Sequence, residues 1–197
     1  MLKCCKVVIF TNEFNLQRFN IPTFQHYNNK MQHLLILNQQ QIQQKIDRIA
    51  YQVLEDNLEE DEIIIAGILP SGNKIAHRIK NVLDEIAPFK SKLVGIELDK
   101  QSTSLKAHVD FNVHDCSNKV VILVDDVMNS GRTLAYGFGV FRDVPLKKLR
   151  TVVLIDRNHK SFPMTTDYAG MALSTVLKEH VDVVLDEEGE EDAVYLR

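Results

Sequence analysis

The sequence has no long hydrophobic run and few cysteines. Among its 197 residues no apolar stretch approaches the roughly 20 residues that span a bilayer, and the run at 7–10 is too short for the core of a signal peptide. Cys4, Cys5 and Cys116 form neither a disulfide framework nor a set with metal-ligand spacing, so we interpret them as free thiols. These absences favour a soluble cytoplasmic protein with no membrane partner and argue against a disulfide-bonded secreted domain.

Basic residues are outnumbered by acidic ones, 23 against 27, which gives a formal net charge of −4. The first thirty residues carry four basic side chains against Glu13 alone, so the remaining residues, with 19 basic against 26 acidic, carry −7. An acidic body argues against a large surface for the phosphate backbone of a nucleic acid. A local basic cluster at Lys147, Lys148 and Arg150 keeps an RNA-binding alternative open.

Residues 1–30 are rich in Asn, Gln and Phe, have no clear periodicity, and stop just before a regular apolar pattern begins at Met31. We expect them to be an extension, either an appendage of the protein or translated sequence upstream of a start at Met31. The length of the chain suits one domain, which we place at residues 31–197.

Hydrophobic patterning within 31–197 alternates between strand and helix. Apolar residues at helical spacing predict helices over 38–58, 75–86 and about 133–143, and continuous apolar runs predict buried strands over 62–68, 92–98, 119–124 and 150–155. This alternation predicts an α/β fold with a doubly wound, mainly parallel sheet. Ligands bind outside the carboxyl ends of the strands in such sheets, where the segments 69–72, 125–133 and 156 onward fall.

The segment from Val120 to Thr133 carries the clearest chemical pattern. An apolar strand ends in Asp125 and Asp126, followed by Asn-Ser-Gly-Arg-Thr leading into a helix. A loop before a helix presents free backbone N–H groups and the positive end of the helix dipole, which suits a phosphate dianion. Two carboxylates would repel that phosphate unless neutral sugar hydroxyls lay between them. The order of residues therefore predicts a sugar-phosphate site.

Two other interpretations of this segment compete with the sugar-phosphate site. A nucleotide P-loop needs a glycine four residues ahead of a Gly-Lys pair, and this loop has neither that glycine nor the lysine. An Asp-Asp pair alone could simply end a strand and start a loop. The complete string VILVDDVMNSGRT at 121–133 favours the site over both.

That string resembles the phosphoribosyl pyrophosphate signature of type I phosphoribosyltransferases. More narrowly, residues 122–196 resemble the family of bifunctional pyrimidine operon attenuation proteins and uracil phosphoribosyltransferases, through VLIDRNHK at 153–160, TDYAG at 166–170, and VDVVLDE followed by DAVYL near the end. Residues 34–58 resemble the first helix of that family, and the likeness is weak over 99–118. The resemblance implies a type I phosphoribosyltransferase fold with a C-terminal β-hairpin hood, and a homo-oligomer.

The resemblance also assigns roles to residues. It implies a catalytic acidic pair at the ribose hydroxyls, Asp125 and Asp126, and a loop for the 5-phosphate formed by Asn129, Ser130, Gly131, Arg132 and Thr133. It implies a pyrophosphate loop at Leu69, Pro70, Ser71 and Gly72. Similar proteins usually carry Thr-Arg-Gly where this chain has Pro70-Ser71-Gly72, so a charged hydrogen bond worth roughly 1.5–3 kcal/mol is missing. Lys74 or Arg78 could replace it, or both could be solvated helix charges.

For the base, the resemblance implies stacking on Tyr168 and recognition by neighbouring backbone at Ala169, although a lone tyrosine is equally explained by packing. Asp156 and Arg157 follow a strand end and so lie at the ligand edge. Asn129 stands where purine-using relatives often carry Asp, which favours a pyrimidine. The resemblance implies Mg²⁺ held mainly by substrate oxygens and waters, with the acidic pair nearby. We expect the stretch 99–113 to be a loop that closes over the site.

These observations favour an enzyme that transfers the phosphoribosyl group from phosphoribosyl pyrophosphate to a nucleobase, with uracil implied by the resemblance. The alternative is a nucleotide-sensing RNA-binding regulator of pyrimidine genes with little or no catalysis. The acidic body and the absence of arginine at Ser71 favour the enzyme over the regulator.

Overall fold

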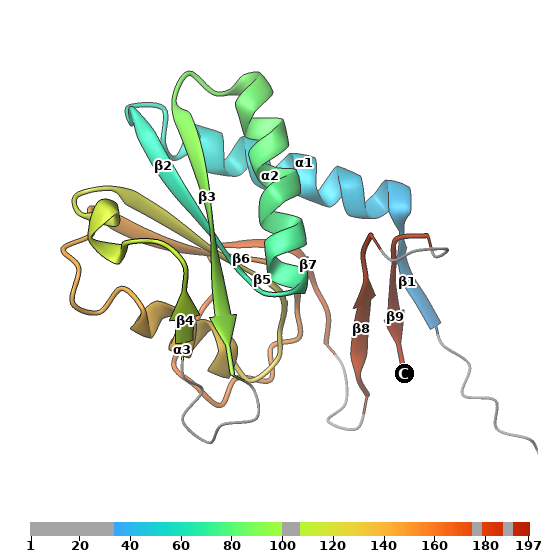
Figure 1. Cartoon of the computed structure of the whole chain (residues 1–197). Helices are drawn as coiled ribbons and strands as arrows, with labels where there is room; N and C mark the ends of the chain where they lie inside the picture. Colours follow the sequence, from blue (N-terminus) through green and yellow to red (C-terminus); the bar gives the residue numbers. More distant parts are fainter. Residues whose placement is uncertain (1–33, 100–106, 175–178, 187–190) are drawn as a thin grey trace, which may run out of the picture. The chain divides into compact units, whose positions relative to one another are not determined.

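The computed structural model describes residues 34–99, 107–174, 179–186 and 191–197. The described residues all belong to one unit, Met31–Arg197, and the extension expected at 1–30 lies outside them. They form a six-stranded sheet, a three-stranded sheet and three α-helices (Figure 1).

The six-stranded sheet has the order β4-β3-β2-β5-β6-β7. Its strands are β2 (Glu62–Ile68), β3 (Lys90–Leu98), β4 (Ala107–Val109), β5 (Val120–Met128), β6 (Lys148–Asp156) and β7 (Tyr168–Ala172). All neighbouring strands pair in parallel except β4, which runs antiparallel to β3. The doubly wound, mainly parallel sheet expected from the sequence is confirmed. Because the chain moves outward from β2 in one direction and from β5 in the other, the order reverses between these two strands.

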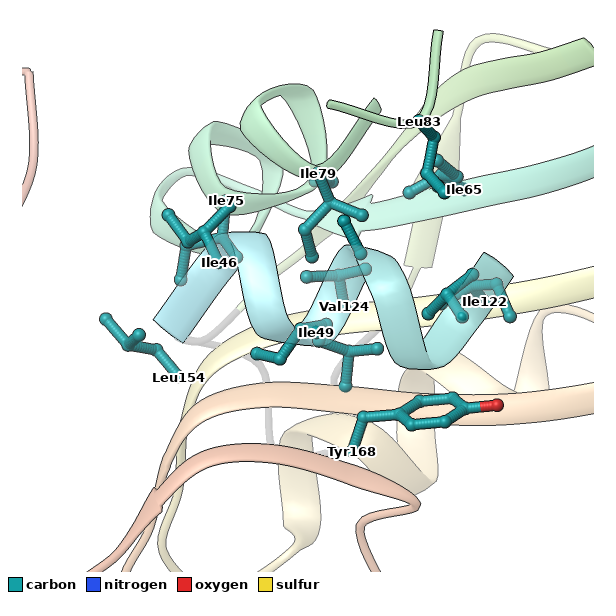
Figure 2. Packing of buried hydrophobic residues seen from close by; sticks show 14 of the residues in the cluster. Ile46, Ile49, Ile65, Ile75, Ile79, Leu83, Ile122, Val124, Leu154 and Tyr168 are labelled. Atoms are coloured by element: carbon teal, nitrogen blue, oxygen red, sulfur yellow. The ribbon is translucent and has the colours of Figure 1, made fainter. Parts of the chain in front are cut away.

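Helices α1 (Gln39–Glu55) and α2 (Ser71–Ile86) cover one face of this sheet, and the short α3 (Arg132–Gly139) packs on the other. Successive strand residues face opposite sides, so Ile63 and Ile65 of β2 pack under α1 and α2 while Ile64 and Ala66 join the cluster of α3. Figure 2 shows the first of these clusters. The strands are therefore buried on both faces, as their continuous apolar runs indicate.

Helix α1 follows directly from its sequence. Asn38 caps it: its side chain accepts a hydrogen bond from the backbone N–H of Gln41, whose side chain accepts one from the N–H of Asn38 in return. The buried residues recur every three or four positions, at Ile42, Ile46, Ile49, Ala50 and Val53. The glutamine-rich segment is thus the start of an amphipathic helix.

The three-stranded sheet contains β1 (Leu34–Asn38), β8 (Val181–Val184) and β9 (Ala193–Leu196), in the order β1-β9-β8. Strands β8 and β9 form the antiparallel C-terminal pair implied by the resemblance. We call the three strands, together with residues 185–186 and 191–192 between β8 and β9, the hood. The pairing of β1 with β9 was not predicted, because it joins residues from opposite ends of the domain.

Two cations of α2 connect that helix to the hood. The amine of Lys74 donates to the backbone carbonyl of Leu185, and the guanidinium of Arg78 bonds the carboxylates of Asp186 and Asp192. Both side chains are engaged by the hood, so a pyrophosphate contact by Lys74 or Arg78 would require them to leave these partners and stays a prediction. Neither is a simple solvated charge.

Three segments differ from the sequence expectation. Strand β5 continues through the acidic pair to Met128, because Asp125, Val127 and Met128 pair with β6. Helix α2 begins at Ser71, so the pyrophosphate loop runs directly into it. Within 99–113 the described part holds β4 paired to β3, and residues 100–106 of the expected closing loop lie outside the described residues. In the part of the chain that is described, no helix is long and apolar enough to span a bilayer.

Candidate active site

Two of the predicted loops meet where the strand order reverses. The loop 69–72 follows β2, and the loop 129–133 follows β5, its parallel neighbour. A Cβ atom added at Gly72 would lie 2.6 Å from the carbonyl oxygen of Val124 and 2.8 Å from the Cα of Asp125. Only glycine allows this approach, so the start of α2 packs directly on the backbone beside the acidic pair. The carboxyl ends of β2 and β5 thus form one site.

The acidic pair lies within strand β5, near its carboxyl end, rather than after the strand. Asp125 is buried, with 6% of its surface exposed, and its Oδ1 accepts the backbone N–H of Asp126 at 3.0 Å. The half-buried Asp126 repeats the arrangement one residue on, accepting the N–H of Val127 at 2.8 Å. Each carboxylate is therefore held in a defined orientation by the following backbone N–H, as a group that positions sugar hydroxyls requires.

Beside the acidic pair lies a cavity of about 250 Å³, lined by Asp125 and by residues 127–134. All residues of the predicted 5-phosphate loop, Asn129 to Thr133, line this cavity. Gly131 has φ of 79°, in the left-handed region that glycine adopts without strain, and α3 begins at the next residue. The loop therefore presents backbone N–H groups and a helix start to the cavity, which is the arrangement that suits a phosphate.

The segment between β6 and β7 supports this loop from outside the cavity. The carbonyl oxygen of Ser130 accepts two backbone hydrogen bonds, from Ser161 at 2.9 Å and from Phe162 at 3.0 Å. Phe162 also makes an edge contact with the ring of Tyr136, over which the guanidinium of Arg132 lies at 5.7 Å. The sequence offered no sign of this support, because the bonds join backbone groups some thirty residues apart.

Asp156 and Arg157 lie at the same edge of the sheet. Asp156 ends β6 opposite Met128, and the backbone N–H of Arg157 donates to the Met128 carbonyl at 2.9 Å. Arg157 is 3% exposed and its guanidinium donates to the carbonyl of Glu179. The fold thus brings both residues next to the cavity wall, while their contact with a base stays a prediction.

Tyr168 and Ala169 lie elsewhere, which contradicts their assignment to the base. Tyr168 pairs with Val152 well before the carboxyl end of β6, and its ring packs in the cluster under α1 (Figure 2). Its hydroxyl donates to Asp56 at the end of α1, and burial together with that bond raises the pKa of Tyr168 above its usual value. The carbonyl of Ala169 accepts from Arg48. The packing interpretation of Tyr168 is the correct one.

The three cations of the basic cluster at 147–150 all have partners within the domain, and two of them form ion pairs. Lys147 pairs with Glu60 at 2.8 Å, Lys148 donates to the backbone carbonyl of Asp56 at 2.9 Å, and Arg150 pairs with Asp167 at 2.8 Å. The cluster lies near the start of β6, at the sheet edge opposite the cavity. It is therefore a poor candidate for a phosphate-binding surface.

Among the residues that the structure describes, no three His, Cys, Asp or Glu side chains gather in a way that could hold a metal ion. Of the acidic pair, Asp125 lines the cavity and Asp126 is the next residue of β5. This donor set fits an ion bound mainly by substrate oxygens and water, the usual situation for Mg²⁺, and does not fit a metal held by the protein alone.

Comparison with known proteins agrees with this geometry. The family model described as "Phosphoribosyl transferase domain" matches residues 35–188. The chain is 36% identical over 168 residues to "Bifunctional protein PyrR" of Clostridium acetobutylicum, covering 81% of this chain and 94% of that protein. It is 30% identical over 171 residues to the protein of the same name from Fusobacterium nucleatum, covering 82% and 97%.

The fold is similar to that of the hypoxanthine phosphoribosyltransferase of Trypanosoma cruzi, with a TM-score of 0.68, 19% identity, and coverage of 83% of this chain and 96% of that one. It is also similar to a hypoxanthine-guanine phosphoribosyltransferase from Bacillus anthracis, with a TM-score of 0.65, 19% identity, and the same coverage of 83% and 96%. At this level of identity the likeness concerns the fold alone.

Proposed function

Because the chain belongs to the phosphoribosyltransferase family, and within it to the bifunctional PyrR proteins, we propose that it transfers the phosphoribosyl group from phosphoribosyl pyrophosphate to uracil. The family membership confirms the type I phosphoribosyltransferase predicted from the string at 121–133. The observation that supports the proposal is the cavity at 127–134, in which a phosphate-type loop lies beside the oriented carboxylate of Asp125, followed in the chain by that of Asp126. The product would be uridine monophosphate, with release of pyrophosphate.

In this reaction the bond between the ribose C1 and the pyrophosphate oxygen breaks, a bond from C1 to a ring nitrogen of the base forms, and that nitrogen loses its proton. Positive charge develops on the ribose as the bond breaks. Asp125 and Asp126 would orient the ribose hydroxyls and stabilise that charge electrostatically, while the loop 129–133 holds the 5-phosphate. No protein nucleophile is required.

Mg²⁺ is the proposed cofactor. Asp125 and Asp126 would share in holding it, with the substrate supplying most of its oxygens. When bound, the ion neutralises negative charge on the pyrophosphate. The cytoplasmic location, the homo-oligomeric state and the separate extension at 1–30 are further proposals that rest on the sequence.

The base assignment rests on the family and on Asn129, which lies exposed at the cavity. An amide cannot serve as the carboxylate that purine-using relatives often carry at this position. With Tyr168 in the core and the Ala169 carbonyl bonded to Arg48, we expect the base to contact residues other than these two. The remaining candidate from the sequence is Arg157, whose backbone N–H donates to Met128, a residue of the cavity wall.

A base-panel assay tests the function. The protein is incubated with phosphoribosyl pyrophosphate, Mg²⁺ and one of uracil, cytosine, hypoxanthine, guanine or adenine, and pyrophosphate release is measured. We expect release with uracil. Asp126→Asn should abolish it, whereas Asp143→Asn, at an exposed carboxylate outside the site, should leave the rate unchanged. Release with no base, or an unaltered rate in Asp126→Asn, would reject the enzyme or the site, respectively.

The second candidate is the RNA-binding regulator, because the relatives are bifunctional proteins by name. The ion pairs of Lys147 and Arg150, and the bond from Lys148 to a backbone carbonyl, speak against an RNA surface there. Titration of a pyrimidine-operon leader RNA at several salt concentrations tests it. Tight binding that weakens steeply with salt would support a phosphate-backbone contact, while weak binding insensitive to salt would dismiss the regulator.

A further inference from the structure

We propose that Asp156 is a positioning residue for the 5-phosphate loop. Its side chain joins the two ends of the segment 157–166 by hydrogen bonds, and that segment holds the loop in the conformation that binds the phosphate. The inference rests on the proposed function, since it assigns the cavity at 127–134 to a phosphoribosyl group. It replaces base contact as the role of Asp156.

The side chain of Asp156 joins the two ends of the segment. It is 8% exposed, and its Oδ1 accepts the backbone N–H of Asn158 at 2.8 Å while its Oδ2 accepts the hydroxyl of Thr166 at 2.7 Å. Its backbone carbonyl accepts the N–H of Leu173 at 2.8 Å, after β7. Both carboxylate oxygens are thus engaged by the segment, which leaves this group a structural clamp rather than a ligand for a base.

The first bond of this clamp also stabilises an unusual backbone conformation. Asn158 has φ of 57°, in the left-handed region that residues other than glycine seldom adopt. This turn directs its N–H back to Asp156 and sends the chain toward the phosphate loop. Without the carboxylate, the turn loses the hydrogen bond that compensates its conformation.

The middle of the segment makes the contact with the phosphate loop. The carbonyl of Ser130 accepts the N–H groups of both Ser161 and Phe162, at 2.9 and 3.0 Å. Because a trans peptide unit is planar, with its C=O and N–H pointing in opposite directions, these bonds also set the direction of the Gly131 N–H, away from the segment. Gly131 lines the cavity, so this N–H is a donor that a bound phosphate requires.

Close packing around Gly131 further restricts the conformation of the loop. A Cβ atom at Gly131 would lie 3.2 Å from the Cβ of Met164 and 3.6 Å from that of Phe162. The loop therefore lies flush against the segment 157–166. A shift of the segment must be transmitted to the loop, because neither side has space to absorb it.

The experiment measures binding of ribose 5-phosphate by calorimetry, and the KM values for phosphoribosyl pyrophosphate and for uracil, in full-length variants. Asp156→Ala removes both acceptors and should raise the Kd of ribose 5-phosphate and the KM of phosphoribosyl pyrophosphate about tenfold or more, leaving the KM of uracil within about twofold. Asp156→Asn should restore most of the affinity, because its amide oxygen still accepts from Asn158 and its amide NH₂ donates to the Thr166 hydroxyl.

Asp167→Ala is the matched control. Asp167 accepts bonds from the N–H of Thr151 at 2.8 Å and from Arg150 at 2.8 Å, at the other end of β6, away from the phosphate loop. The Asp167→Ala substitution should lower the unfolding temperature without changing the Kd of ribose 5-phosphate. Should Asp156→Ala fail to fold, Thr166→Val removes one donor with little change of shape, and is expected to raise that Kd about twofold to fivefold.

Equal losses in Asp156→Ala and Asp167→Ala would overturn the proposal, since they would show general destabilisation. A raised KM for uracil alone would return Asp156 to the base site, and an unchanged Kd in all variants would remove it from both. The ribose 5-phosphate measurement does not need turnover. Wild-type protein that binds this probe but transfers to no base would defeat the proposed function and leave the role of Asp156 intact.

Discussion

Loop 129–133 and loop 69–72 follow neighbouring strands of one sheet, and they are held in place by different means. The first is held by hydrogen bonds from the segment 157–166 to Ser130 and by the left-handed conformation of Gly131. The second is held by close packing, since Gly72 lies against the backbone of β5, and by α2, into which it runs. The first carries a complete phosphate-binding pattern, whereas the second lacks the arginine of similar proteins at Ser71.

The comparison shows that the second loop keeps the residue that sets its position but lacks the residue that would bind pyrophosphate by charge. Its glycine, which sets the approach to Asp125, is present, while the charged donor to pyrophosphate is not. The neighbouring cations Lys74 and Arg78 bond to the hood, and supplying the charge would cost them these partners. We therefore expect a correctly placed pyrophosphate loop that stabilises its ligand weakly.

The largest effect is expected from Gly72→Ala, which disrupts the packing of the second loop. The new methyl group would meet backbone atoms 2.6 and 2.8 Å away, which cannot move aside as a flexible side chain could. The start of α2 must shift away from Asp125, and a misplacement of about 1 Å at a reacting centre costs roughly 100-fold in rate. Steady-state kinetics with uracil should show a loss of kcat/KM of about that size.

Gly139→Ala is the control for this change, because no atom lies within 4 Å of the position its Cβ would take. Its kcat/KM should match the wild type. A Gly72→Ala variant with normal kinetics would mean that the approach of the two loops is unimportant.

The next prediction reverses the chemical difference between the loops. Ser71→Arg supplies the charged donor that similar proteins carry, and such a bond is worth roughly 1.5–3 kcal/mol, so kcat/KM for phosphoribosyl pyrophosphate should rise about tenfold or more. Inhibition by pyrophosphate should become stronger in parallel. Ser71→Gln, which is long but uncharged, should give little of this gain. A decrease in Ser71→Arg would contradict the idea of a weak loop.

Gly131→Ala tests the conformation of the first loop. A left-handed conformation costs a residue with a Cβ about 1–2 kcal/mol, and the methyl group would also lie 3.2 Å from Met164. We expect the KM for phosphoribosyl pyrophosphate to rise about fivefold to thirtyfold, with the KM for uracil nearly unchanged. An increase confined to uracil would place the base, rather than the phosphate, in this loop.

The smallest effect on activity is expected from Arg78→Met, which weakens the link between the helix behind the second loop and the hood. Burial alone would raise the pKa of Asp192, but the hydrogen bonds from Arg78 and from the N–H of Asp186, with the charges of Arg78 and Lys74, hold it below its usual value. The ionised form is therefore favoured in the folded state, and it contributes stability above the unfolded pKa of about 3.9. That contribution is lost as the pH falls through the lower folded value.

Chemical denaturation at a series of pH values measures the contribution of the pair Arg78–Asp192 to stability. Arg78→Met should lower the free energy of unfolding by about 1–3 kcal/mol at pH 7, because Asp192 keeps 8% exposure and loses its partner. The difference from wild type should shrink below about pH 4, where an unpaired Asp192 is protonated. A difference that stays constant down to pH 2 would assign the loss to packing of the Arg78 stem.

Elements with strong local patterns were predictable. The continuous apolar runs at 62–68 and 150–155 correspond to β2 and β6, and the helical spacing after Asn38 corresponds to α1. The sequence also located the phosphate loop and the acidic pair in a single string. Less predictable was the end of β5, where pairing with β6 carries the strand past Asp125 to Met128, because the pairing partner lies some thirty residues further along the chain.

By itself, the sequence determined the class of the fold, the family, and the residue types of the sugar-phosphate site, because each can be recognised from strings of contiguous residues and their order along the chain. Only the tertiary structure decided which partners the side chains of Tyr168, Asp156, Lys74 and Arg78 bond. Each of the four has a side chain whose chemistry suits a ligand, yet each bonds a partner distant in the sequence or clamps a turn. A local string records which groups are available, whereas long-range packing decides which of them face the cavity.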